Sequence, residues 1–134
     1  MILVLDASVI LKWFMQEPDS IAALEYKKHY LSGDISIFFP DLLIYEFANV
    51  LRFKHSMSEP VIKTAITAIL EMGFDIVTPT ASLLEEAIHI SFKSGLSVYD
   101  SCYIALANDI KCPLITADNK LHHLANKISH IECL

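Results

Sequence analysis

The stretch ILVLDAS, residues 2–8, decides the expected fold. Ile2 to Leu5 is an unbroken apolar run, typical of a strand that is buried on both faces of a parallel sheet. The run ends in Asp6. Because an unpaired carboxylate in apolar surroundings is costly, Asp6 is expected where the strand emerges beside a polar partner, a cation or a helix N-terminus. In one interpretation Asp6 or Ser8 only caps the next helix. Whether Asp6 has a chemical role depends on the other carboxylates.

Outward from this strand, the chain alternates between short apolar runs and segments with helical periodicity. Strands are predicted at 2–5, 35–39, 76–77, 114–116 and 131–132, and helices at 8–15, 18–31, 41–55, 58–73, 80–93, 98–110 and 118–127. This order predicts one α/β domain with a mainly parallel sheet. If the first and fourth strands are neighbours, Asp6 and Asp118 face each other at the carboxyl ends of those strands.

The composition limits the class of protein. The chain has 134 residues, a hydrophobic share of 54% and a formal net charge of −6. The negative charge argues against a nucleic-acid binder that works through a basic surface, but it does not exclude an enzyme that uses a metal cation against phosphate. The apolar excess is consistent with a sheet buried on both sides and with an apolar oligomer face.

The cysteines and histidines do not form a metal or disulfide motif. The three cysteines include no CxxC pair, and the six histidines include no HxxxH or HExxH spacing. Free thiols are therefore expected, and a zinc site is not. The chain shows neither a signal peptide nor an apolar stretch of membrane-spanning length, so a cytoplasmic protein is expected.

Glu46 is the only interior acid of an otherwise apolar helical segment, LLIYEFANVL. Residues three and four positions away on its helix are Leu42, Leu43, Asn49 and Val50, so no base on the same helix neutralises it. One interpretation is a solvated helical glutamate. The apolar surroundings favour the other, a partly buried functional carboxylate.

Asp100 and Asp118 each have an ordinary explanation as well. Asp100 begins the segment YDSCYIALA, where an acid in the first helical turn is favoured by the helix dipole. Asp118, in PLITADNKL, has the position of a helix N-cap. Together with Asp6 and Glu46, however, they form a set of four acids that can flank one edge of the sheet. Like charges raise one another's pKa unless they share a cation.

Carboxylate oxygens favour Mg²⁺ or Mn²⁺ over zinc, and metal-assisted phosphodiester hydrolysis is a natural use of such a cluster. Ser8 and Thr116 each lie two residues from an acid of the set. In extended backbone they would point to the same side as that acid and could orient it or a metal-bound water. The alternative role for both is to satisfy backbone groups at caps and turns.

The segments LVLDASVILKWF, LLIYEFANVL, SVYDSCYIALA and PLITADNKL together resemble the PIN-domain nucleases, most closely the VapC-like toxins of type II toxin–antitoxin pairs. The resemblance covers nearly the whole chain, and all four acidic positions match. It implies a single PIN domain over residues 1–134 with a three-layer α/β/α fold. It also implies Mg²⁺- or Mn²⁺-dependent cleavage of single-stranded RNA, a homodimer and inhibition by a small antitoxin protein. The implied metal ligands are Asp6, Glu46, Asp100 and Asp118.

Two departures from the family pattern stand out. Ser101 follows Asp100 where many relatives carry alanine. Basic residues are also few, which leaves the path of the RNA undefined. Those near the motifs in sequence are Lys12, Arg52, Lys54, Lys93 and Lys120.

Two other classes of protein fit the sequence less well. A phosphate-handling α/β protein would need paired acids after the first strand, or a second aspartate where this chain has Ser8. A non-catalytic binding protein could keep the fold, but it would not need all four acids. The apolar helices at 41–55 and 58–72 are the predicted dimer face. Trp13 and Phe14 are expected to pack in the core or in that interface rather than to stack on bases.

Overall fold

Five parallel strands form the centre of the molecule. The computed structural model describes residues 1–134 and has the strand order β3-β2-β1-β4-β5. All four strand pairings are parallel, so the predicted α/β fold with a parallel sheet is confirmed. The strands are β1 (Ile2–Leu5), β2 (Ser36–Pro40), β3 (Asp75–Val77), β4 (Leu114–Thr116) and β5 (Ile131–Cys133).

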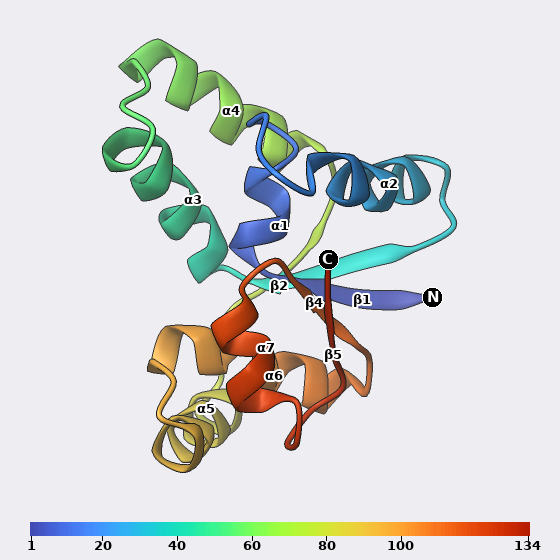
Figure 1. Ribbon diagram of the computed structural model, residues 1–134, viewed down its shortest axis with the longest axis vertical. Helices are drawn as coiled ribbons and strands as arrows, with labels where there is room; N and C mark the ends of the chain where they lie inside the picture. Colours follow the sequence, from blue (N-terminus) through green and yellow to red (C-terminus); the bar gives the residue numbers. More distant parts are fainter.

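Helices cover both faces of this sheet, which makes three layers (Figure 1). One layer holds α1 (Ala7–Leu11), α2 (Ser20–Leu31), α3 (Leu42–Phe53) and α4 (Glu59–Glu71), and the other holds α5 (Ala81–Ser94), α6 (Val98–Ile110) and α7 (Asn119–Ala125). None of these helices has both the length and the apolar character needed to cross a lipid bilayer.

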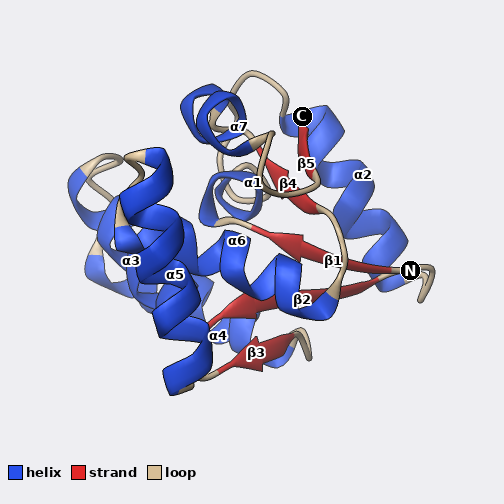
Figure 2. Cartoon of the chain, turned by 90° about the horizontal axis from the view of Figure 1, so that it is seen from below, coloured by secondary structure: helices blue, strands red, loops and turns tan.

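The first strand lies in the middle of the sheet, between β2 and β4 (Figure 2). Val4 pairs with Phe38 on one side and with Leu114 on the other. Val4 and Leu5 have no exposed surface. A central position, with helices on both faces, explains why the stretch from Ile2 to Leu5 is apolar at every position rather than at alternate ones.

The first helix is shorter than predicted. It was expected to run to residue 15, but α1 ends at Leu11 and continues as tight turns, in which the amides of Lys12, Trp13 and Phe14 bond to carbonyls three residues earlier. These turns place the indole of Trp13 in the core, where its Nε1 donates to the carbonyl of Ala23 at 2.8 Å. The gain of a buried hydrogen bond explains why the regular helix stops early.

Trp13 and Phe14 are packing residues, as predicted. Trp13 is buried, and its ring centroid lies 5.9 Å from that of Phe74. The ring of Phe14 meets that of Phe47 edge to face, with centroids 5.1 Å apart. The second contact fixes the segment after α1 against α3, the helix that carries Glu46.

Candidate active site

The side chain of Asp6 lies where the central strand ends. Its neighbour β4 ends beside it, and the amide of Asp6 bonds to the carbonyl of Ile115 at 3.3 Å. The first and fourth strands are therefore neighbours, an arrangement that the sequence permits but does not determine. It brings Thr116, which is 110 positions away in sequence, into hydrogen-bonding contact with the carboxylate of Asp6.

Three groups donate hydrogen bonds to the Asp6 carboxylate. The amide and the hydroxyl of Ser8 both donate to Oδ1, the amide at 3.0 Å, and the hydroxyl of Thr116 donates to Oδ2. Asp6 is thus the N-cap of α1, as the simpler interpretation predicts. It is also held at both oxygen atoms, which is more than capping requires. The two hydroxyl groups fix the orientation of the carboxylate.

The contact of Ser8 with Asp6 has a different cause from the predicted one. Ser8 was expected to share a side with Asp6 through extended backbone, but it lies in the first turn of α1. It reaches Asp6 because an N-cap side chain folds back over that turn. The Ser8 hydroxyl also accepts from the amide of Ala117 at 2.9 Å, and Thr116 Oγ1 accepts from the amide of Asp118 at the same distance. Ser8 and Thr116 therefore connect the ends of β1 and β4.

Burial controls the charge of Asp6. The residue is only 5% exposed, and burial raises its pKa to about 6, although the hydrogen bonds from Ser8 and Thr116 act in the opposite direction. Losing water disfavours the charged form of a carboxyl group, and here no basic side chain forms an ion pair with it. The ionised form of Asp6 is therefore costly in the protein alone.

Glu46 reaches the same edge of the sheet from α3. Its Oε1 accepts a hydrogen bond of 2.6 Å from the hydroxyl of Tyr103 on α6. Burial raises the pKa of Glu46, the bond from Tyr103 lowers it, and the negative charges of Asp100 and Asp6 raise it further. Glu46 is thus half-buried and close enough to two other acids to feel their charge.

Sequence reasoning did not assign Tyr103 to the site. The hydroxyl is buried, and burial and the charge of Glu46 both raise its pKa, so it remains a hydrogen-bond donor at neutral pH. A tyrosine three residues after Asp100 shares its side of α6. That spacing was available in the sequence, but nothing local identified Glu46 as the acceptor.

Asp100 and Asp118 complete the set. Asp100 lies in the first turn of α6, where its amide donates to the Ser97 hydroxyl at 3.0 Å. Burial, and then the charge of Asp118, raise its pKa, while Ser97 and Lys120 lower it. Asp118 caps α7 by accepting from the amides of Lys120 at 2.9 Å and Leu121 at 3.2 Å. Asp118 is exposed to solvent, whereas Asp6, at the other end of the set, is buried.

The donor chemistry of this set fits Mg²⁺ or Mn²⁺. All four candidate ligands are carboxylates, which are the oxygen donors that these ions prefer. None of the four forms an ion pair with a lysine, arginine or histidine. No three acidic, histidine or cysteine side chains stand close enough to make a ready-formed metal-binding group. The acids therefore form a loose cluster of negative charge without an ion-pair partner.

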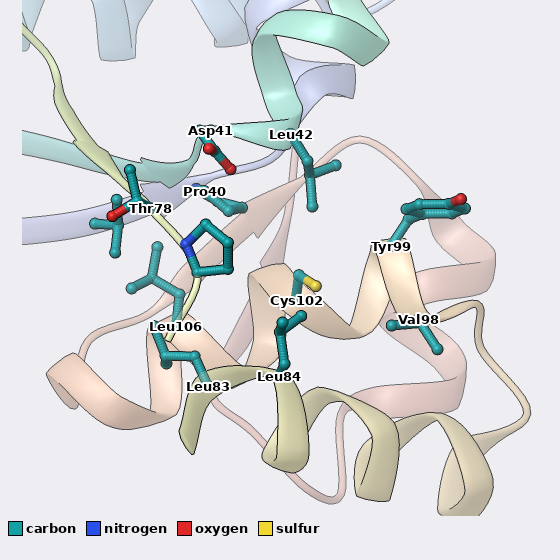
Figure 3. A pocket seen from close by; sticks show the side chains of 12 residues that line it. Pro40, Asp41, Leu42, Thr78, Leu83, Leu84, Val98, Tyr99, Cys102 and Leu106 are labelled. Atoms are coloured by element: carbon teal, nitrogen blue, oxygen red, sulfur yellow. The ribbon is translucent and has the colours of Figure 1, made fainter. Parts of the chain in front are cut away.

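The protein also has an apolar cavity of about 210 Å³, whose lining side chains are drawn in Figure 3. It is bounded by the end of β2, the segment after β3, and helices α5 and α6, with Leu84 and Tyr99 among its lining residues. The thiol of Cys102 also lines it, and burial, followed by the charges of Glu46 and Asp41, raises the pKa of that thiol. None of the four acids lines the cavity, so it is separate from the candidate catalytic centre.

Two of the basic residues near the motifs contact side chains outside the acid cluster. Lys12 is held in an ion pair with Glu17 at 3.2 Å, and the guanidinium of Arg52 lies 4.7 Å over the ring of Phe53. Lys120 is the base whose charge acts on the acid cluster, through Asp100.

Comparisons with known proteins agree with this architecture. The family model of the PIN domain matches residues 3–127. Ribonuclease VapC3 of Pyrobaculum aerophilum is 32% identical over 124 residues, which cover 89% of this chain and 91% of that protein. Two solved structures have the same fold. One is VapBC2 from Rickettsia felis bound to a promoter DNA fragment, with a TM-score of 0.73, 13% identity and coverage of 100% of this chain and 99% of that chain. The other is the sarcin–ricin-loop-cleaving toxin VapC20 of Mycobacterium tuberculosis, with a TM-score of 0.72, 14% identity and coverage of 90% and 93%.

The PIN-domain model matches nearly the full length of the chain, and a curated relative is more than 30% identical to it. The shared three-layer fold and the four acids at one edge of the sheet agree with this match. The chain therefore belongs to the PIN-domain family and is a relative of the VapC ribonucleases.

Proposed function

We propose that this protein is a Mg²⁺- or Mn²⁺-dependent endoribonuclease that hydrolyses single-stranded RNA. The observation that carries the proposal is the uncompensated charge of Asp6, Glu46, Asp100 and Asp118. Burial raises the pKa of three of them, and no basic side chain pairs with any of the four. A protein that keeps such a costly cluster has a use for a cation there.

Each acid has a proposed role. Asp6, Asp100 and Asp118 hold the ion directly or through water, and Glu46 completes the negative charge around it. When bound, the ion supplies a Lewis acid that activates water for attack on phosphorus and balances charge in the transition state. Ser8 and Thr116 keep the Asp6 carboxylate in one orientation through their hydrogen bonds. Tyr103 does the same for Glu46.

The relatives support a toxin that has a protein partner. The curated relative is named as a ribonuclease, and the solved structures with the same fold include a toxin–antitoxin complex from Klebsiella pneumoniae. We propose that this chain acts as one PIN domain over residues 1–134 in the cytoplasm and is inhibited by a small antitoxin protein.

A homodimer is also part of the proposal. The helices α3 and α4 leave large apolar side chains exposed, among them Tyr45 and Phe53 on α3 and Val61 and Leu70 on α4. Apolar surface of this kind on a small protein is typical of a self-association face.

A cleavage assay with matched variants tests the activity. The parent should cleave a fluorogenic single-stranded RNA with Mn²⁺ or Mg²⁺, lose activity with a chelator and regain it when the metal is restored. Asp6→Asn, Glu46→Gln and Asp100→Asn keep the shape of each side chain and remove its charge, so each should lower the rate by orders of magnitude. Double variants should lose little more than single ones, because residues that act as a unit are non-additive.

An exposed acid outside the cluster gives the control, since Glu85→Gln on α5 should leave the rate unchanged. RNA cleavage that survives both the chelator and Asp6→Asn would overturn the proposal. If no RNA tried is cleaved, growth arrest on expression becomes the deciding measurement. Arrest by the parent that Asp100→Asn relieves would uphold the proposal.

A further inference from the structure

Three ionisable side chains meet between the ends of two helices, away from the acid cluster. Glu17 Oε2 lies 3.2 Å from the ammonium of Lys12, and Glu17 Oε1 lies 3.4 Å from Nε2 of His55. Only 11% of the Lys12 side chain, 26% of that of Glu17 and 16% of that of His55 is exposed. The ammonium of Lys12 also donates to the carbonyl of Pro18 at 2.8 Å.

The imidazole of His55 is the one side chain of this group with an unsatisfied nitrogen atom. Its Nε2 is buried and has no hydrogen-bond partner, although the Glu17 carboxylate faces it. Buried nitrogen atoms of side chains are nearly always hydrogen-bonded. A proton on Nε2 would turn this contact into a charge-assisted interaction with Glu17.

The backbone beside both contact residues has an unusual conformation. Asp19, two residues after Glu17, has a φ of +66°, and Ser56, directly after His55, has a φ of +51°. Residues other than glycine adopt this left-handed region at some cost, and they keep it when surrounding contacts require it. Both chain segments are therefore bent at the point where they meet.

The contact joins two parts of the candidate active site. Lys12 directly follows α1, the helix whose Ser8 bonds to Asp6, and His55 follows α3, the helix that carries Glu46. Phe14 and Phe47 form a second contact between the same two segments. The position of Glu46 relative to Asp6 therefore depends on how residues 12–17 hold α3.

We propose that Glu17 and His55 are positioning residues, and that their contact fixes α3, and with it Glu46, against residues 12–17. The consequence for catalysis rests on the proposed nuclease function. Glu17 supplies the only carboxylate within 4.0 Å of the imidazole, and Lys12 shares that carboxylate. Arg52 and Lys54 on the same helix end are exposed, and at the start of α4 Glu59 pairs with Lys63 at 3.7 Å.

The first experiment measures stability and hydrogen exchange in the full chain without metal. His55→Gln should lower the melting temperature by about 3 °C. His29→Gln is the matched control, because His29 also contacts a carboxylate, that of Asp34 at 3.1 Å, but on the exposed surface. The loss of melting temperature in His29→Gln should be smaller. Amide exchange in residues 46–54 should be faster in His55→Gln and Glu17→Gln than in His29→Gln.

The second experiment measures RNA cleavage at pH 7. Glu17→Gln and His55→Gln should lower kcat at least about threefold with little change in KM, because a small displacement of a catalytic group slows the chemical step. His29→Gln should keep the kcat of the parent. His55→Lys, which keeps a basic side chain opposite Glu17, should restore kcat.

The outcomes separate the two proposals. If the parent cleaves no RNA and arrests no growth, the nuclease function fails, while melting and exchange still decide whether the contact fixes α3. If the parent cleaves RNA but both variants keep its kcat and its exchange rates in α3, positioning is overturned and the contact only adds stability. A loss of melting temperature in His55→Gln that is no larger than that in His29→Gln would overturn the stabilising role of the buried contact.

Discussion

The hydroxyl of Tyr103 donates a hydrogen bond of 2.6 Å to Oε1 of Glu46, and this bond joins α6 to α3 across the acid cluster. It is the direct link between the helix that carries Asp100 and the helix that carries Glu46. Because it favours the ionised form of Glu46, it opposes the effects of burial and of the neighbouring acids on that carboxyl group.

Removing this hydroxyl should impair catalysis more than folding. In Tyr103→Phe the pKa of Glu46 should rise, because the bond that lowers it is lost while burial and like charges remain. Hydrogen bonds to charged groups contribute about 1.5–3 kcal/mol, and the half exposure of Glu46 favours the lower end. We expect about a tenfold lower kcat at pH 7 and an acid limb of the pH–rate profile shifted to higher pH. An unchanged profile would show that Glu46 does not need Tyr103.

Neutralising Asp6 should stabilise the protein in the absence of metal. The pKa of Asp6 is raised from 3.8 to about 6, so the folded state holds the proton more tightly than the unfolded state between these values. Stability linked to Asp6 is therefore fully present below about pH 3.8 and is lost as the pH rises through 6. Asp6→Asn should be more stable than the parent at pH 7.5, by up to about 3 kcal/mol, and the difference should vanish near pH 4. Urea unfolding at both pH values measures this. A parent that is the more stable protein at pH 7.5 would contradict the assignment.

Divalent metal should stabilise the parent but not the variant that lacks Asp6. A cation that binds the folded state relieves the repulsion among the acids and raises the melting temperature in proportion to its occupancy. Mg²⁺ or Mn²⁺ should raise the melting temperature of the parent, and a chelator should reverse the effect. Asp6→Asn should show little shift, whereas the exposed control variant Glu85→Gln should respond like the parent. No shift in the parent at millimolar metal would count against a shared site.

Removing the Thr116 hydroxyl should change the charge of Asp6. Thr116→Val keeps the shape of the side chain but loses the hydrogen bond to Oδ2, so the pKa of Asp6 should rise further. At pH 6.5 a larger fraction of Asp6 would then be protonated, and the rate of RNA cleavage should fall more at pH 6.5 than at pH 8. If the pH profile of Thr116→Val overlays that of the parent, the Thr116 hydroxyl serves only to accept the hydrogen bond from the Asp118 amide.

The proposed dimer face can be tested by charge insertion. Phe53→Glu places a carboxylate on the exposed surface of α3 and should lower the mass measured by light scattering to that of a monomer. Phe92→Glu on α5 is the matched control, because Phe92 is 87% exposed and lies on a different helix. If Phe92→Glu dissociates the dimer and Phe53→Glu does not, the face lies on α5. A parent that is monomeric at every concentration would remove the dimer from the proposal.

The sequence by itself determined the order and kind of the elements. Apolar runs such as Ile2 to Leu5 and Leu114 to Ile115 predict strands that are buried on both faces, and helical segments between them force a parallel sheet. The caps at Asp6 and Asp118 could also be predicted, because capping depends on residues only two or three positions apart. These features follow from local periodicity and local hydrogen bonds. The exception is the early end of α1, where burial of Trp13 in the core outweighs the helical pattern.

The partners of the site residues were decided by the tertiary structure alone. Thr116 and Asp6 are 110 positions apart and meet because β4 pairs with β1, while Tyr103 and Glu46 are 57 positions apart and meet because α6 and α3 reach the same edge of the sheet. Glu17 and His55 meet through the turns that follow α1 and α3. Such contacts depend on which strands are neighbours and on how helices pack over them. They carry no periodic signal in the chain, because many pairings of the same apolar surfaces satisfy the same pattern of buried and exposed residues.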